Sequence, residues 1–179
     1  MRFSFDTRRA PEYVPRRGEK WGIVGNSGDA RGVESSMTTY YGTDHYSIDD
    51  KGRLAVPAHA RRSTGKNTTF LLVPGFEGCL ALYSETQWAR VEERLQQLPG
   101  KRMDRAFKRA LLMNAKRVTM DAQGRISIPS ALLDRAGLGK DAVLLGQGTH
   151  IEIWNPERLQ AVLGEAETNF EQVAEEVLK

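Results

Sequence analysis

The alternation of apolar and polar positions along the chain repeats once, and this repeat organises the sequence. Each copy has a short apolar segment, a polar turn of the form Asp-x-x-Gly-Arg, a second apolar segment and a proline. Later apolar runs also match between the copies. The matching segments, offset by 72 residues or by 71 after one residue of slippage, are Tyr46–Pro57 with Val118–Pro129, Phe70–Val73 with Ala142–Leu145, and Leu80–Tyr83 with Ile151–Trp154. We infer a tandem duplication of units of about 45 residues.

The polar turn of each copy has the chemistry of a β-hairpin. Asp49 and Asp121 can accept backbone N–H bonds at the first turn position, and Gly52 and Gly124 can supply a positive φ. Four short strands in one copy are too few to close a hydrophobic core. We therefore expect the two copies to fold together.

Helical patterns lie between and after the strands. Pro57 and Pro129 stand where a short helix can begin. Ser84–Gln87 has the sequence of a capping box, and Asn155-Pro156 is an N-cap followed by proline in the first turn. The expected helices are Ala58–Arg62, Ser130–Ala136 closed by Gly137, one from Ser84 to about Leu98, one from about Met103 to Asn114, and one over Glu165–Lys179.

Two of these helices are amphipathic. In the helix between the copies, the spacing of Met103, Phe107, Ala110 and Leu111 predicts the buried face. The other face carries Lys101, Arg105 and Lys108, as a solvated, phosphate-facing or subunit-facing surface. In the last helix the apolar stripe is Phe170, Val173, Ala174 and Val177, for which we expect a core or subunit contact, or the groove of a partner protein.

These patterns divide the chain into five parts. We expect a disordered N-terminal extension at 1–38, a first repeat at 39–90, a helical linker at 91–115, a second repeat at 116–159 and an acidic amphipathic helix at 160–179. The extension is rich in glycine and has two arginine pairs, and Met37 stands just before the first strand. Met37 is thus a candidate start, and the rival interpretation is a basic arm that adds non-specific DNA affinity.

Composition fits a soluble protein of one or two small domains, with 179 residues, 40% hydrophobic and 27% charged. No apolar run approaches the roughly 18 residues of a membrane span, and Met1–Arg9 lacks the apolar core of a secretory signal. The single Cys79 excludes an internal disulfide, and the three histidines have no metal-ligand spacing. We expect a cytoplasmic protein without cofactor, metal or membrane partner.

Charge is distributed unevenly, although the net charge is only +3. Residues 101–117 carry seven cations against one acid, whereas 157–179 carries six acids against two cations. The chemistry of catalysis is missing: Gly146-Gln147-Gly148 lacks the third glycine of a dinucleotide loop, and Gly65-Lys66-Asn67 lacks the upstream glycine and the hydroxyl residue of a P-loop. We therefore expect no enzyme.

The hairpin chemistry favours DNA recognition. A two-stranded ribbon fits the major groove, and an arginine just past the turn can bind guanine O6 and N7 with both arms of its guanidinium. Asp49 and Asp121 could each hold such an arginine, Arg53 or Arg125, in place. The alternative interpretation is a stable hairpin whose arginine is merely solvated.

The paired Asp-x-x-Gly-Arg blocks resemble the MraZ family of bacterial transcriptional regulators. The segments Leu144–Gly148 and Glu152–Trp154, and the arginine-rich linker with Arg109–Leu112, share this resemblance, which covers residues 39–160. It implies an α+β fold with a mainly β core, in which two tandem swapped-hairpin half-barrels of the SpoVT/AbrB type form one pseudo-symmetric barrel with flanking helices. It also implies ring-shaped homo-oligomers and a nucleoid-associated location. These would bind guanine-rich direct repeats in double-stranded DNA upstream of the protein's own division and cell-wall genes, usually as a repressor.

Carried over onto this sequence, the resemblance assigns the motif-structural positions to Asp49, Gly52, Asp121 and Gly124. The expected DNA-binding residues are Lys51, Arg53, Arg61, Arg62, Gln123 and Arg125. The first repeat adds Lys51, Arg61 and Arg62, where the second has Gln123, Leu133 and Asp134. We therefore expect the first repeat to make more phosphate contacts.

Two alternatives from other functional classes stay open. An antitoxin-like module of the same superfamily would bind DNA and use the acidic helix Glu165–Lys179 to occupy a toxin. An interaction protein would bind another protein of its gene neighbourhood. The tandem duplication disfavours the first alternative, because such antitoxins usually resemble one copy that dimerises.

Overall fold

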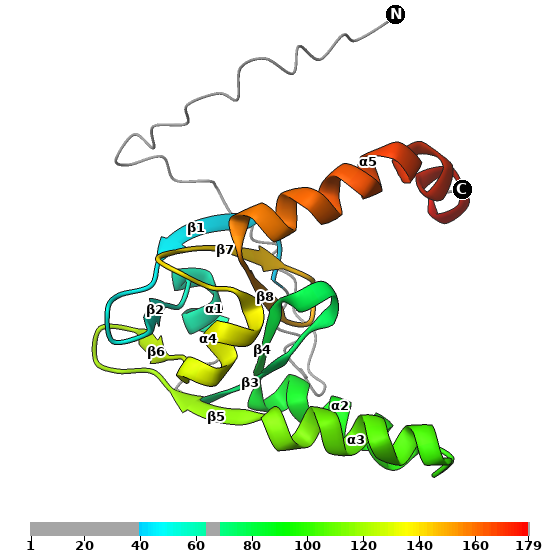
Figure 1. Ribbon diagram of the computed structural model, residues 1–179, viewed down its shortest axis with the longest axis horizontal. Helices are drawn as coiled ribbons and strands as arrows, with labels where there is room; N and C mark the ends of the chain where they lie inside the picture. Colours follow the sequence, from blue (N-terminus) through cyan, green and yellow to red (C-terminus); the bar gives the residue numbers. More distant parts are fainter. Residues whose placement is uncertain (1–39, 64–68, 179) are drawn as a thin grey trace, which may run out of the picture. The chain divides into compact units, whose positions relative to one another are not determined.

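The computed structural model of the chain describes residues 40–63 and 69–178, so the predicted extension at 1–38 and the question of Met37 lie outside the described residues. The fold is α+β, as predicted (Figure 1). The strands are β1 Thr43–Ser47, β2 Arg53–Ala55, β3 Thr69–Pro74, β4 Leu80–Ser84, β5 Lys116–Thr119, β6 Arg125–Ser127, β7 Asp141–Gly146 and β8 Ile151–Trp154. The helices are α1 Ala58–Ser63, the short η1 Phe76–Gly78, α2 Glu85–Gln96, α3 Arg102–Asn114, α4 Ser130–Ala136 and α5 Pro156–Val177.

The two repeats exchange their first strands. All pairings are antiparallel, and the six-stranded sheet has the order β1-β7-β8-β4-β3-β5. Strand β1 of the first repeat therefore lies on β7 of the second, and β5 of the second repeat lies on β3 of the first. The remaining strands, β2 and β6, pair with each other in a separate ribbon. Neither repeat can complete its sheet without the other.

The strand register follows the sequence repeat. Leu54 pairs with Ile126, its own counterpart 72 residues later, and Ala81 pairs with Glu152, its counterpart at the shifted offset. The β1–β7 and β5–β3 pairings are also equivalent. Ser47 of β1 faces Asp141 of β7, and Thr119, the counterpart of Ser47, faces Thr69, the counterpart of Asp141. A pseudo-twofold axis thus passes through the β2–β6 ribbon and the β4–β8 pair.

The expected closed barrel is not formed by the described strands. The six-stranded sheet ends at β1 and β5, which do not pair with each other, and the β2–β6 ribbon is a separate sheet. The ribbon and helices α1 and α4 cover one face of the sheet. The core between them includes Leu54, Phe70, Leu72, Leu80, Ile126, Leu132 and Ile153, all buried. The physical reason is that β2 and β6 have only three residues each, too short to bridge both sheet edges.

Helix ends agree closely with the sequence. Helix α4 spans Ser130–Ala136 and ends at Gly137 in the left-handed region with φ 63°. The side chain of Ser84 accepts a hydrogen bond from the Gln87 amide, and Asn155 caps α5 by accepting from two backbone amides. None of the described helices is long and apolar enough to cross a membrane.

The prediction of a buried face on α3 was wrong. Met103 and Phe107 were expected in the buried face of α3 but are 76% and 50% exposed, and Ala110 is exposed too. Only Leu111, near the end that packs on β3, contacts the cluster around Trp88. The helical segment predicted from Glu165 belongs to α5, which begins at Pro156, where Asn155 and Pro156 predicted a helix start.

Candidate nucleic-acid interface

The first hairpin loop, between β1 and β2, is organised by Asp49. One carboxylate oxygen, Oδ1, accepts hydrogen bonds from the amides of Lys51 at 3.0 Å and Arg53 at 2.9 Å. The other, Oδ2, accepts from Arg53 Nε at 2.8 Å and lies 2.7 Å from Nη2. Gly52 has φ +71°, as the turn requires. Asp49 therefore accepts the backbone bonds of the turn and also holds the arginine, the two roles that the sequence offered as alternatives.

The second loop, between β5 and β6, has the same bonds. Asp121 Oδ1 accepts from the amides of Gln123 and Arg125 at 2.9 and 3.0 Å. Its Oδ2 accepts from Arg125 Nε at 2.9 Å and Nη2 at 2.7 Å, and Gly124 has φ +76°. Each repeat therefore fixes one arginine by a carboxylate four residues earlier.

This pairing keeps both aspartates ionised and occupies one edge of each guanidinium. The hydrogen bond from Arg53 lowers the pKa of Asp49 to about 2, and the one from Arg125 lowers the pKa of Asp121. Both aspartates are therefore ionised at neutral pH. Because the carboxylate occupies the Nε–Nη2 edge, the edge left for a base is Nη1–Nη2, which can donate two parallel bonds to guanine.

The β2–β6 ribbon joins the two loops into one site. Beyond the ladder, the Val56 amide donates to the Gly124 carbonyl, and the Ile128 amide donates to the Gly52 carbonyl, both at 2.9 Å. Arg125 Nη1 also lies 3.7 Å from Asp49 Oδ2 of the other loop. The two arginines thus form one pseudo-symmetric pair, although they lie 72 residues apart in sequence.

The helices after the ribbon lie on the turn glycines, which sequence reasoning missed. A methyl group at Gly52 would lie 3.0 Å from the Ile128 carbonyl oxygen and 3.3 Å from Leu133 of α4. A methyl group at Gly124 would lie 2.9 Å from Cδ of Arg61 on α1. Arg61 and Leu133 are counterparts in the repeat, so α1 places a cation over the second loop where α4 places an apolar side chain over the first. The sequence repeat had shown the difference between Arg61 and Leu133, but not that each lies over the turn glycine of the other repeat.

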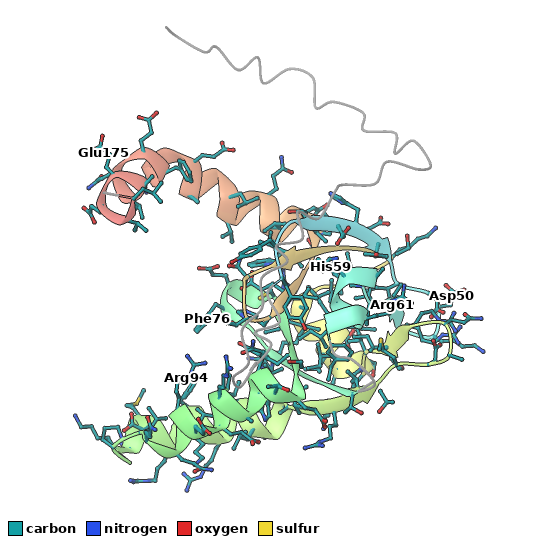
Figure 2. The ribbon with its side chains drawn as sticks, turned by 180° about the vertical axis from the view of Figure 1, so that it is seen from behind. Asp50, His59, Arg61, Phe76, Arg94 and Glu175 are labelled. Carbon is teal, nitrogen blue, oxygen red and sulfur yellow. The ribbon has the colours of Figure 1, made fainter. Side chains whose placement is uncertain are left out.

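The other predicted contacts lie around this pair. Lys51 and Gln123 are exposed on the two loops, and Arg61 is exposed on α1. Figure 2 shows Asp50 on its hairpin loop and Arg61 on the same side of the molecule. Arg62 belongs to α1, but its side chain lies outside what the structure describes. Arg117, one of the linker-region cations, is paired with Glu85 at 2.8 Å.

Among the described residues, no group of three or more His, Cys, Asp or Glu side chains could hold a metal ion. Glu152, outside the loops, is in contact with three polar side chains. Its carboxylate accepts from Trp154 Nε1 at 2.8 Å and from Gln147 at 3.3 Å, and lies 3.8 Å from His150. His150 also stacks on Tyr83 at 4.7 Å between ring centroids.

Comparison with known proteins matches the duplication. The family model described as "MraZ protein, putative antitoxin-like" matches twice, at residues 39–110 and 111–179. The chain is 40% identical over 140 residues to proteins named transcriptional regulator MraZ from Natranaerobius thermophilus and Heliobacterium modesticaldum. In both cases the match covers 78% of this chain and 96% of the relative. Two MraZ domains in tandem, together with these relatives, show that the chain belongs to the MraZ family of transcriptional regulators, a family without enzymatic activity.

Proposed function

We propose that this chain is a sequence-specific DNA-binding regulator that recognises guanine-rich direct repeats with its two hairpin loops. The observation that carries the proposal is the carboxylate-held arginine at equivalent places in both loops. An arginine fixed along its Nε–Nη2 edge loses little side-chain freedom when it binds a base, so more of the bond energy appears as affinity. A solvated arginine, the alternative interpretation, would not need two bonds to a carboxylate.

Phosphate contacts would surround this pair. Lys51 and Arg61 are exposed beside the loops, and Arg62 follows Arg61 on α1. Their counterparts in the second repeat carry no positive charge. The first repeat would therefore supply more of the salt-dependent affinity, while Gln123 offers an amide to a base edge or a phosphate.

Self-association would multiply these weak contacts. A ring-shaped homo-oligomer presents several loop pairs, and direct repeats of matching spacing engage several at once. The regulated DNA would be the region upstream of the protein's own division and cell-wall genes, with repression as the usual effect. A nucleoid-associated, cytoplasmic location follows from that role.

The test is a fluorescence-anisotropy titration on the DNA upstream of the native gene, with a scrambled probe and two salt concentrations. Arg53→Ala and Arg125→Ala should each reduce discrimination between the probes by about 5- to 150-fold, equivalent to 1–3 kcal/mol per bidentate contact. Arg90→Ala on α2 is the matched control, because it also removes one charge but lies outside the loops. Equal binding to both probes, unchanged in the loop variants, would refute the proposal.

The relative weight of the repeats has its own test. Lys51→Ala should lower affinity for both probes and reduce the salt dependence, whereas Gln123→Ala should leave the salt dependence unchanged. Equal effects of these two substitutions would contradict a greater phosphate role for the first repeat.

A second candidate function is an antitoxin-like or other protein-binding role of the acidic C-terminal segment Glu165–Lys179. The observation in its favour is the exposed apolar side of α5, with Phe170 68% exposed. If this role is correct, tagged full-length protein should retain a specific partner that a Phe170→Asp variant loses, while binding to a DNA probe with a single repeat stays unchanged. Retention of the same partner by the variant would exclude this segment.

A further inference from the structure

We propose that the C-terminal half of α5 docks, in a second copy of this chain, into the groove between the α2–α3 pair and the outer face of the sheet. The inference rests on the self-association in the proposed function and names the two surfaces that would make it. They are different surfaces, so the contact would be head-to-tail. A head-to-tail contact generates a ring when its rotation closes.

The acceptor is an apolar groove on the face of the sheet opposite the main core. It is a cavity of about 640 Å³ at the junction of α2, α3, β3 and β4. Its walls are mainly aromatic and aliphatic, and among them are Phe76, Tyr83, Trp88, Leu98, Phe107 and Leu111. Phe76 is 79% exposed at its rim, where Figure 2 also shows Arg94. An open groove of this composition leaves apolar surface in water, which an amphipathic helix can cover.

The ligand for this groove is an apolar stripe on α5. Phe170, Val173 and Val177 stand at i, i+3 and i+7, so they lie on one side of the helix. They are 68%, 54% and 73% exposed, respectively. Anchors at this spacing are those by which a helix binds an apolar groove. The core contact that the sequence allowed for this stripe is therefore not made within the described chain.

Charge complementarity selects this occupant. The groove has Arg94 and Arg135 in its lining, together with one carboxylate, that of Glu152, while Arg105 and Lys108 lie on the other face of α3. Helix α5 is acidic where its stripe is exposed, with Glu167, Glu171 and Glu175. The basic segment 101–117 and the acidic segment 157–179 are thus also the two segments that expose apolar side chains of their helices. Opposite charges around an apolar contact favour this pairing and disfavour a contact of α5 with another α5.

The internal symmetry supports the same conclusion. Helices α2 and α5 are counterparts, since each follows the fourth strand of its repeat. The N-cap of α2 is the last residue of β4, and the N-cap of α5 is the residue directly after β8. Helix α2 has a neighbouring helix, because α3 shares the groove lining with it. The exposed stripe of α5 shows no such neighbour among the described residues. A second copy's α2–α3 pair would give α5 an equivalent helical partner.

The first experiment measures the mass of the full-length protein by light scattering over a range of concentrations. Phe170→Asp should lower the mass toward that of the 20.0 kDa chain, and so should Phe107→Asp on the groove side. Gln172→Asp is the matched control, because it adds the same charge two residues from Phe170 on the opposite side of α5, and it should keep the native mass. Thermal unfolding of each variant checks the fold, which these exposed positions should leave intact.

The second experiment tests which surfaces meet. Full-length chains carrying Phe170→Cys are mixed with full-length chains carrying Leu98→Cys under mild oxidation. The native Cys79 is buried and does not compete. A disulfide between the two kinds of chain is expected, whereas Gln172→Cys should give none. A native mass in Phe170→Asp, no disulfide between chains, or a disulfide only within a chain carrying both cysteines would each overturn the inference.

DNA binding separates this inference from the proposed function. On a probe with one repeat, Phe170→Asp should bind like the native protein. On a probe with several repeats, it should lose the gain that the native protein shows. If the native protein does not distinguish its own DNA from a scrambled probe, the proposed function fails, while the mass and disulfide results still decide the docking of α5.

Discussion

The two turn glycines offer a test of how the loops are built, because they share a backbone conformation and differ in what lies against them. Gly52 and Gly124 have φ of +71° and +76°. An alanine at either position lowers the free energy of unfolding by about 1–2 kcal/mol, because a residue with a Cβ is strained in the left-handed conformation. At Gly52 the new methyl group also meets the Ile128 carbonyl oxygen at 3.0 Å and Leu133 at 3.3 Å. This backbone cannot move freely, because the Ile128 amide is bonded to the Gly52 carbonyl.

At Gly124 the three atoms nearest to the methyl group all belong to the long side chain of Arg61, whereas at Gly52 the nearest atom belongs to the backbone. We therefore expect Gly124→Ala to cost about 1–2 kcal/mol and Gly52→Ala about 2–5 kcal/mol, since overpacking typically adds 1–3 kcal/mol. Urea unfolding followed by circular dichroism measures both free energies. Displacing Arg61 should also weaken DNA binding in Gly124→Ala more than its stability loss explains.

A double-mutant cycle isolates the Arg61 contact. In an Arg61→Ala background, Gly124→Ala should keep only the conformational cost, and its effect on DNA affinity should disappear. Gly52→Ala should be unaffected by the same background. Equal losses for the two glycine variants, or a larger one at Gly124, would refute the reasoning from their surroundings.

Three other outcomes are expected. The pKa of Asp49 is about 2 in the folded protein, against an ordinary value of 3.8. The stability that Asp49 contributes is therefore complete above pH 3.8 and is lost as the pH falls from 3.8 toward about 2. Over that window the urea midpoint of Asp49→Asn should vary less than that of the native protein. Burial raises the pKa of the Cys79 thiol to about 12. A thiol reagent at pH 8 should therefore label the native chain slowly and the urea-unfolded chain rapidly. Fast labelling of the native chain would contradict the burial of Cys79. Leu54→Ala should lower the free energy of unfolding by about 2–5 kcal/mol, because Leu54 is fully buried opposite Ile126. Met113→Ala, on the exposed side of α3, should change it by no more than about 0.5 kcal/mol. Similar losses in the two variants would contradict the assignment of Leu54 to the core.

Much of this protein followed from its sequence because the information was local or repeated. The turn of each hairpin depends on an aspartate, a glycine and an arginine within five residues, and the structure has the bonds expected of them. The ends of α4 and α5 follow from Gly137 and Asn155, whose effects reach only a few residues. The duplication was visible because two copies of one pattern keep a constant offset.

Tertiary structure decided whatever depends on distant segments meeting. The exchange of β1 and β5 between the repeats, and the 3.7 Å approach of Arg125 to Asp49, come from the pairing of segments more than forty residues apart in sequence. The exposed faces of α3 and α5 were not predictable, because an amphipathic pattern shows which side of a helix is apolar but not what covers it. Within the described chain these apolar faces stay exposed, and that is why the same pattern that suggested a buried face leads to the proposed docking surface.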